Sequence, residues 1–189
     1  MNDLAADTAA AYQGLASALA CIDPMQWDVL SLCSRWRVRE VIAHLTMPVR
    51  HDDRSFDVGA AFTRVSDEIA ASDARLPIAV LLAHLRSDEL ATWLPAGGQI
   101  GALTHVVVHG LDVTVPLGLP PTAPVSGVRA VLDSLANGVH RYFSVSIAGR
   151  RLEATDLDWS YGAGMVLRAP ANDLVLALAG RRATPEVSL

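Results

Sequence analysis

The segment Leu103-Thr-His-Val-Val-Val-His-Gly-Leu-Asp-Val113 places two histidines, His105 and His109, four residues apart inside an apolar run. A histidine in such a run must give its ring nitrogens partners, because an unpaired buried polar group costs roughly 1–3 kcal/mol. A divalent metal ion is one partner that satisfies several rings at once. Whether these two histidines bind one decides most of what the sequence says about function.

Local propensity leaves the conformation of this segment open. The β-branched runs at 106–108 and 113–115 favour a strand, and residues four apart share a face in a strand as well as in a helix. Asp112 separates the two conformations, because it joins His105 and His109 on one stripe only if the segment is helical. The helix gives the more coherent site, in which Asp112 accepts a ring N–H or pairs with an arginine.

A third histidine, His44, lies upstream in Trp36-Arg-Val-Arg-Glu-Val-Ile-Ala-His-Leu45. Glu40 precedes it by four residues, so a helix would place both on one face. We expect His44 to be the third ligand and Glu40 to orient it. The alternative for any of these histidines is an ordinary core or surface residue with satisfied polar atoms. The remaining histidines are assigned to that alternative: His51, His84 and His140.

Composition excludes several classes of protein. Hydrophobic residues make up 51% of the 189 residues and aromatic residues only 5%, a balance that suits helix packing. The net charge of −5 and the lack of a basic run argue against nucleic acid as a partner. No apolar stretch is long enough for a membrane span and no signal peptide is visible, so we expect a cytoplasmic protein. Cys21 and Cys33 lack metal-ligand or redox spacing, and we expect buried free thiols rather than a disulfide.

The chain divides into a helical part and a mixed tail. Shorter helices are expected between Asp53 and Trp93, with breaks at Asp73–Pro77 and Pro95–Gly98. The longer helices are expected at Asp3–Ala20, Ser34–Met47, Gln99–Val115 and Pro124–Phe143.

Beyond Phe143 the pattern changes. Short strands are expected at 145–147, 151–155 and 165–168, with a turn at 161–164 and a last helix over Asp173–Ala179. The sequence thus predicts a mainly α protein with a helical bundle over residues 1–143 and a small α/β element over residues 144–189. By size the second part is too small for a secure core of its own, so it should pack on the bundle.

Three separated motifs resemble the DinB-like metalloprotein superfamily, and are most similar to its mycothiol-dependent maleylpyruvate isomerase branch. The first is Trp36–Leu45, and the second runs from the paired histidines through His-Gly-Leu-Asp112 to Leu117-Gly118. The tail segments Leu152–Ser160 and Ala169–Arg181 look like the C-terminal domain of that branch.

The resemblance implies an antiparallel four-helix bundle that holds a divalent metal, usually zinc, with three side chains near one end. Carried over by position, the ligands are His44, His105 and His109, with Asp112 and Glu40 as supporting groups. In the isomerase a glutamate stands at the position of His105, so this chain has the three-histidine set common among DinB-like proteins. Three neutral histidines leave an electrophilic metal with open positions, as in catalytic sites.

The tail departs from the isomerase as well. In the isomerase the C-terminal domain is fuller and supplies an arginine to the active site. Arg181 closes the matching Leu-Ala-Gly-Arg motif and is the expected catalytic counterpart, with Arg168 as the weaker candidate. The alternative for Arg181 is a surface arginine beside a helix C-terminus.

The resemblance implies a metal-dependent enzyme that uses a low-molecular-weight thiol, mycothiol, on a small electrophilic substrate. Reversible addition of the thiolate across a double bond would give cis–trans isomerisation, and displacement of a group would give thiol transfer; the histidine at position 105 favours transfer. One rival is a non-catalytic, stress-associated metal-binding protein whose bundle pairs with itself as a homodimer. Another is a small-molecule binding module in which the metal only shapes a pocket.

Overall fold

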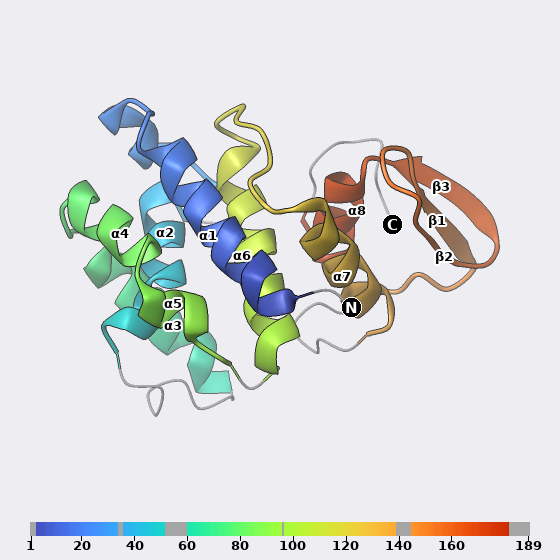
Figure 1. The fold of residues 1–189 in the computed structure, drawn as a ribbon, viewed down its shortest axis with the longest axis horizontal. Coiled ribbons are helices and arrows are strands. Elements are labelled where there is room, and N and C mark those ends of the chain that lie inside the picture. The colour runs from blue at the N-terminus through green and yellow to red at the C-terminus, as the bar shows by residue number, and fades with distance from the viewer. Residues whose placement is uncertain (1–2, 34–35, 52–59, 96, 139–144, 182–189) are drawn as a thin grey trace.

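The computed structural model describes residues 3–33, 36–51, 60–95, 97–138 and 145–181 (Figure 1). Two helical segments and two short 3-10 helices precede the middle of the chain: α1 (Leu4–Leu19), η1 (Pro24–Asp28), α2 (Val38–Leu45) and η2 (Met47–Val49). The remaining helices of the bundle are α3 (Ala60–Asp73), α4 (Ile78–Leu85), α5 (Asp88–Thr92), α6 (Gly98–Thr114) and α7 (Val125–Ala136). The tail contains β1 (Arg150–Ala154), β2 (Ser160–Gly162), β3 (Met165–Ala169) and α8 (Ala171–Leu178). The expected fold class, mainly helical with a small C-terminal α/β element, is confirmed.

Helix α6 lies at the centre of the fold. It packs against α1 and α2 on the bundle side and against α7 and α8 on the tail side. Every residue from Ala102 to Thr114 is buried except His105, which is half-buried. The segment is helical although its valines favour a strand. Tertiary packing around the buried helix outweighs that weak local preference. Of the two conformations considered for Leu103–Val113, the structure shows the helix. It places His105, His109 and Asp112 on one face of α6.

Helix α2 is shorter than the sequence suggests. It begins at Val38 rather than at Ser34, which lies outside the described residues, and it ends at Leu45. Its first turn is closed by the carboxylate of Glu40, which accepts a hydrogen bond from the backbone N–H of Arg37 at 2.8 Å. The 3-10 turn η2, with Pro48 in it, replaces the last expected turn because proline supplies no backbone donor.

Helix α7 also ends early, at Ala136. The chain leaves the helix through Gly138, whose φ of 65° is the left-handed conformation that commonly terminates helices. The expected end at Phe143 and the expected boundary between residues 143 and 144 lie outside the described residues.

The small sheet has the strand order β2-β1-β3, with β2 antiparallel and β3 parallel to β1. The expected strand at 145–147 is not formed, and β2 occupies part of a segment where we expected only a turn. Gly162 permits this pairing, because a Cβ added there would lie 2.4 Å from the carbonyl oxygen of Arg150.

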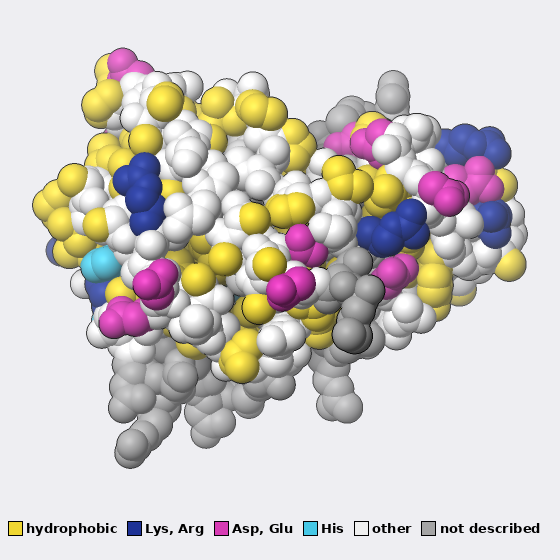
Figure 2. All heavy atoms as spheres, in the orientation of Figure 1, with side chains coloured by type: hydrophobic (Ala, Val, Ile, Leu, Met, Phe, Trp, Pro, Cys, Tyr) yellow, Lys and Arg dark blue, Asp and Glu magenta, His cyan; other side chains and the backbone are white. Residues whose placement is uncertain are grey.

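The tail packs on the bundle through α8, which contacts α6, α7 and β1. The indole N–H of Trp159 also donates to the Asp133 carboxylate of α7 at 2.8 Å. In the face shown in Figure 2, acidic and basic side chains are interspersed over the tail, and Glu153 pairs with both Arg151 and Arg168 at 2.8 Å. Among the described helices, none is long and apolar enough to cross a membrane.

Candidate metal centre

Three imidazole rings meet between α2 and α6. The ring centroids of His44, His105 and His109 lie 4.9, 4.9 and 5.0 Å apart, so they form a nearly equilateral triangle. One nitrogen from each ring lies within 4.8 Å of the others, and Nε2 of His44 is 2.9 Å from Nε2 of His105. The chain therefore brings together the residues that the sequence predicts as ligands, across 61 positions of sequence separation.

The environment of the triangle keeps two of its rings, those of His44 and His105, neutral. Burial, followed by the neighbouring histidines and Arg181, holds the pKa of His44 well below its ordinary value. Burial and then His109 do the same to the pKa of His105. Neutral imidazoles present lone pairs, which is the form that binds a metal ion.

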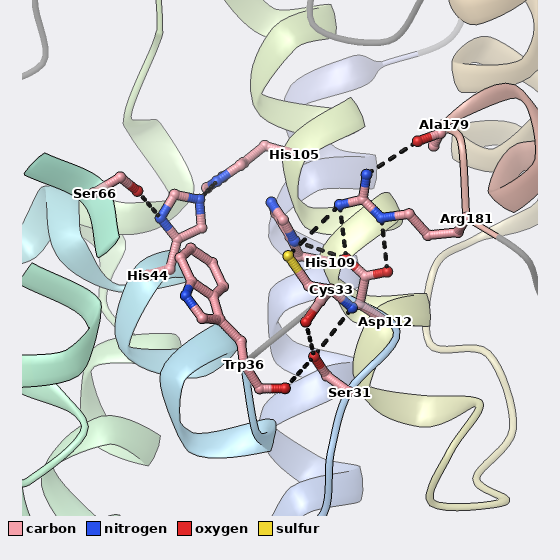
Figure 3. Close-up of polar contacts among 10 residues, drawn as sticks. All are labelled: Ser31, Cys33, Trp36, His44, Ser66, His105, His109, Asp112, Ala179 and Arg181. Carbon is pink, nitrogen blue, oxygen red and sulfur yellow. Dashed lines mark hydrogen bonds and ion pairs between the residues drawn. The ribbon is translucent and has the colours of Figure 1, made fainter. Parts of the chain in front are cut away.

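The partner of His44 is Ser66 on α3, whose hydroxyl lies 2.9 Å from Nδ1 of the ring (Figure 3). Glu40, which we expected to orient His44, has other partners: its carboxylate accepts from the backbone and the guanidinium of Arg37. Sequence reasoning missed Ser66 because nothing in the pattern around position 66 points to position 44.

The partner of His109 is charged. Its Nδ1 lies 2.9 Å from the carboxylate of Asp112, which is fully buried and lies one turn further along α6. Burial opposes ionisation of Asp112, but the hydrogen bond from His109 and the charge of Arg181 outweigh it and lower the pKa of the carboxyl. An ionised carboxylate accepts, so His109 carries a proton on Nδ1, and Nε2 is the ring nitrogen left to bind a metal ion.

Arg181 reaches Asp112 from the end of the tail. Its Nε and Nη2 donate to the two carboxylate oxygens, each at 3.1 Å, and its Nη1 donates to the carbonyl of Ala179 (Figure 3). Its side chain is 16% exposed, so it is not the surface arginine of the alternative interpretation. Arg168, the weaker candidate, is exposed and pairs with Glu153 on the sheet.

Two indole rings lie beside the triangle, one from the loop before α2 and one from the end of α5. The ring of Trp36 lies 4.9 Å from that of His44, and the loop is tied to α6 where the N–H of Leu32 donates to the carbonyl of Asp112 at 3.0 Å. On the far side, the ring of Trp93 lies 5.6 Å from that of His105. The two indoles therefore lie against the rings of His44 and His105.

Cys33 in the same loop was not expected at the site. Its sulfur belongs to a second cluster with His109 and Asp112, and Nη2 of Arg181 lies 3.9 Å from it. Burial and then the Asp112 carboxylate raise the pKa of this thiol to about 11, so it is protonated at neutral pH. Both cysteines are free, as expected, but Cys21 is exposed rather than buried.

The histidines outside the triangle have partners elsewhere. Nε2 of His51 lies 2.8 Å from the Asp73 carboxylate, and Nδ1 of His84 lies 2.8 Å from the guanidinium of Arg50. His140 lies outside the described residues.

The triangle fits a divalent ion on its own chemistry. In a tetrahedral zinc site with Zn–N bonds of about 2.0–2.1 Å, neighbouring donor nitrogens are about 3.3 Å apart, so the pair now at 2.9 Å needs to spread only slightly. Two of the three rings have Nδ1 held by a neighbour, which is how proteins orient histidine ligands. Nδ1 of His105 has no hydrogen-bond partner among the described residues, which leaves this ring the least constrained of the three.

The fold and the three converging rings define a helical-bundle protein with a buried histidine cluster suited to a metal. Residues 8–99 match the family model described as the mycothiol maleylpyruvate isomerase N-terminal domain. This match confirms the resemblance seen in the sequence for the N-terminal part of the chain. The match ends in the first turn of α6, at residue 99, and so includes only one histidine of the triangle, His44.

Two solved structures resemble the whole chain. One is a crystal structure of the mycothiol-dependent maleylpyruvate isomerase, with a TM-score of 0.58 at 17% identity. The other is a histidine-to-alanine mutant of such an isomerase, with a TM-score of 0.60 at 16% identity. Each match covers 95% of this chain and 88% of the other, and at this identity it shows a shared fold. A search of curated proteins gives no match.

Proposed function

We propose that His44, His105 and His109 hold a divalent metal ion, with zinc expected, in an enzyme that uses a low-molecular-weight thiol. The observation that carries the proposal is the equilateral arrangement of the three rings, with ring centroids 4.9–5.0 Å apart. Ordinary core histidines have no reason to converge in this way, because bringing neutral donor atoms together leaves them competing for few protons.

The family of the N-terminal domain supports mycothiol as the thiol. A metal ion bound by three neutral histidines supplies positive charge that stabilises a thiolate at neutral pH, and a thiolate adds to a small electrophile. Thiol transfer and cis–trans isomerisation both begin with attack of a thiolate on the electrophile. The histidine at position 105, where the resemblance places a glutamate in the isomerase, favours transfer.

The chain's own residues prepare the centre for this chemistry. Asp112 fixes the tautomer of His109, and Ser66 holds the ring of His44 through its Nδ1. Trp36 and Trp93 pack beside the rings of His44 and His105. Cys33 stays protonated, so it does not compete with an added thiol as a nucleophile.

We propose a changed role for Arg181. The resemblance predicts a catalytic arginine at this position, but the Nε and Nη2 of Arg181 are directed at Asp112. A substrate carboxylate would have to replace a buried ion pair to reach the same atoms. Arg181 thus secures Asp112, and through it His109.

This role of Arg181 also connects the two parts of the chain. We propose that residues 1–143 form the metal-binding bundle and that residues 144–189 pack on it. The tail then carries Arg181 to Asp112 at the centre of the bundle, so that the two parts complete one site.

Metal analysis of the purified protein tests the first step. We expect about one equivalent of zinc per chain in the intact protein and a large loss in His109→Ala, since two remaining ligands bind weakly. Less than roughly a tenth of an equivalent in the intact protein would end the proposal. Arg168→Ala is the control, because Arg168 is exposed and pairs with Glu153 on the sheet.

A turnover assay with mycothiol and a panel of small electrophiles tests the second step. We expect thiol-dependent turnover that requires metal and that persists in Cys33→Ala and Cys21→Ala. Loss of all thiol-transfer activity in either cysteine variant would show that a protein thiol, not the added one, is the nucleophile. Full metal occupancy with no thiol-dependent turnover of any electrophile would favour the non-catalytic rival.

A further inference from the structure

The side chain of Arg50 forms a second polar centre, outside the histidine triangle. Its Nε and Nη2 contact one carboxylate oxygen of Asp73 at 2.9 and 2.8 Å. Its Nη1 donates to the hydroxyl of Thr46 at 2.9 Å and contacts Nδ1 of His84 at 2.8 Å, and its Nη2 donates to the carbonyl of Ala43 at 2.9 Å. A guanidinium has five N–H groups, and all three nitrogens of this one are engaged.

One end of this centre holds the helix that carries His44. Ala43 is the residue immediately before His44, and its carbonyl is among the last four of α2, which lack partners within the helix. Arg50 supplies a charged donor to that carbonyl, and a cation at a helix C-terminus is favoured by the helix dipole. Thr46, the residue that caps α2, receives a second donor from the same group.

The other end holds the helix that carries the partner of His44. Asp73 is the last residue of α3, and Ser66 lies seven residues earlier, two turns away on the same face. Ser66 contacts the ring of His44, and Asp73 contacts Arg50. The Arg50 and Asp73 side chains are each 14% exposed, so the ion pair between them is poorly screened by water.

We infer that Arg50 is a positioning residue for the metal centre, because one guanidinium fixes both the last turn of α2, with His44, and the helix that aligns Ser66 with it. The inference rests on the proposed metal site. Arg50 does not contact the triangle; it acts through the two helices whose relative position determines the bond between Ser66 and Nδ1 of His44. The competing explanation is that Arg50 only stabilises the fold.

The affinity for zinc distinguishes a positioning role of Arg50 from a role in stability alone. We expect Arg50→Met to raise the Kd for Zn²⁺ by about tenfold, at the low end of the effect of removing a group that orients a ligand. Arg50→Lys should lose much of the same zinc affinity, because a single ammonium cannot bind the Asp73 carboxylate and the Ala43 carbonyl at the same time. Arg86→Met is the matched control, since Arg86 also donates to a helix carbonyl, that of Ala16 in α1.

A double-mutant cycle shows whether Arg50 acts through Ser66. If it does, Arg50→Met combined with Ser66→Ala should lose little more affinity than the stronger single variant, because the two substitutions break one chain of contacts. Additive losses would overturn that route. Leu135→Ala, in the core of α7, supplies a variant that is destabilised without touching this network. Equal Kd values for Arg50→Met and the intact protein, or a shift no larger than that in Leu135→Ala, would overturn the inference.

The ring nitrogens of His44 give a readout that does not depend on metal. In ¹⁵N NMR spectra of the metal-free protein, we expect Arg50→Met to shift the His44 resonances in the same direction as Ser66→Ala. Unchanged resonances would overturn the inference. If the intact protein bound no zinc, the proposed function would fail, while this spectrum would still decide whether Arg50 positions His44.

Discussion

The two helices that supply the histidine triangle hold their rings in different ways. On α6, His109 contacts Asp112, a fully buried carboxylate that is itself bound by Arg181 from the tail. On α2, His44 contacts the uncharged hydroxyl of Ser66, which comes from α3. The α6 side therefore depends on charge, and the α2 side depends on how closely two helices pack.

This difference predicts how each side fails. Hydrogen bonds to charged groups are roughly twice as strong as neutral ones, and a buried charge that loses its partner is heavily destabilising. A substitution on the α6 side should therefore damage both the fold and the metal site. Substitutions on the α2 side should lower metal affinity in smaller steps and leave the fold largely intact.

The largest effect is expected for Asp112→Ala. The substitution leaves the guanidinium of Arg181 buried without its partner and frees Nδ1 of His109, and breaking a buried pair in this way costs about 3–5 kcal/mol. Chemical denaturation should show that loss in the free energy of unfolding. Zinc affinity should fall by roughly 10–100-fold.

The double variant Asp112→Ala with Arg181→Met is the control for this prediction. It removes both charges, so it should recover part of the stability that the single variant loses, but not the metal affinity. If the double variant recovered zinc affinity as well as stability, Asp112 would contribute only to the fold and would have no role in orienting His109.

A smaller effect is expected for Ser66→Ala on the α2 side. The neutral hydrogen bond contributes about 1 kcal/mol to stability, and the loss of a group that orients a ligand should weaken zinc binding by about tenfold. Ser17→Ala is the control, because Ser17 bonds only to a carbonyl of its own helix at the surface. A change in Kd no greater than that of the control would show that His44 needs no partner.

The α6 side of the site follows from the sequence. The spacing of His105, His109 and Asp112 specifies one face of a helix, and any helix over that segment brings the three together. The bundle and the tail likewise follow from periodicity and turn residues. The limits of two helices were less accurate, because α2 spans Val38–Leu45 rather than Ser34–Met47 and α7 ends at Ala136, just before Gly138.

On the α2 side, the hydrogen-bond partner of His44 could not be predicted from the sequence. Glu40 was the expected partner of His44 because helical spacing brings it near, but Arg37, three residues before it, binds its carboxylate instead. Ser66 comes from another helix, 22 residues away, and only the packing of α3 on α2 brings it to the ring. Local periodicity carries no information about such a contact.

A graded effect of pH is expected on the α2 side through His84. Because a guanidinium only donates, Nδ1 of His84 accepts from Arg50 and the ring is neutral. Burial and then the Arg50 charge lower the pKa of His84, against smaller opposing effects from Asp73 and Glu89. The unfolded chain therefore takes up this proton first as the pH falls below about 6.5.

Stability that depends on His84 is thus full above about pH 6.5 and declines as the pH falls from there toward the lowered value. Thermal unfolding of the intact protein and of His84→Asn, followed from pH 8 to pH 5, isolates this contribution. The difference between the two midpoints should shrink with acidification, because asparagine offers an acceptor that does not titrate. Parallel curves would show that the contact between Arg50 and His84 does not respond to protonation.

The smallest effect is expected for Arg168→Ala, which tests whether the tail acts on the site through Arg181 alone. Arg168 is 65% exposed and pairs with Glu153, a pair that water and salt screen effectively. The midpoint of thermal unfolding, the zinc affinity and any thiol-dependent turnover should all match those of the intact protein. Arg181→Ala, compared in the same assays, should lower the midpoint and the zinc affinity, because it leaves the Asp112 charge buried beside His109. If Arg168→Ala instead removed turnover while Arg181→Ala kept it, the substrate would be held by the exposed sheet, and the contact between Arg181 and Asp112 would serve only to fasten the tail.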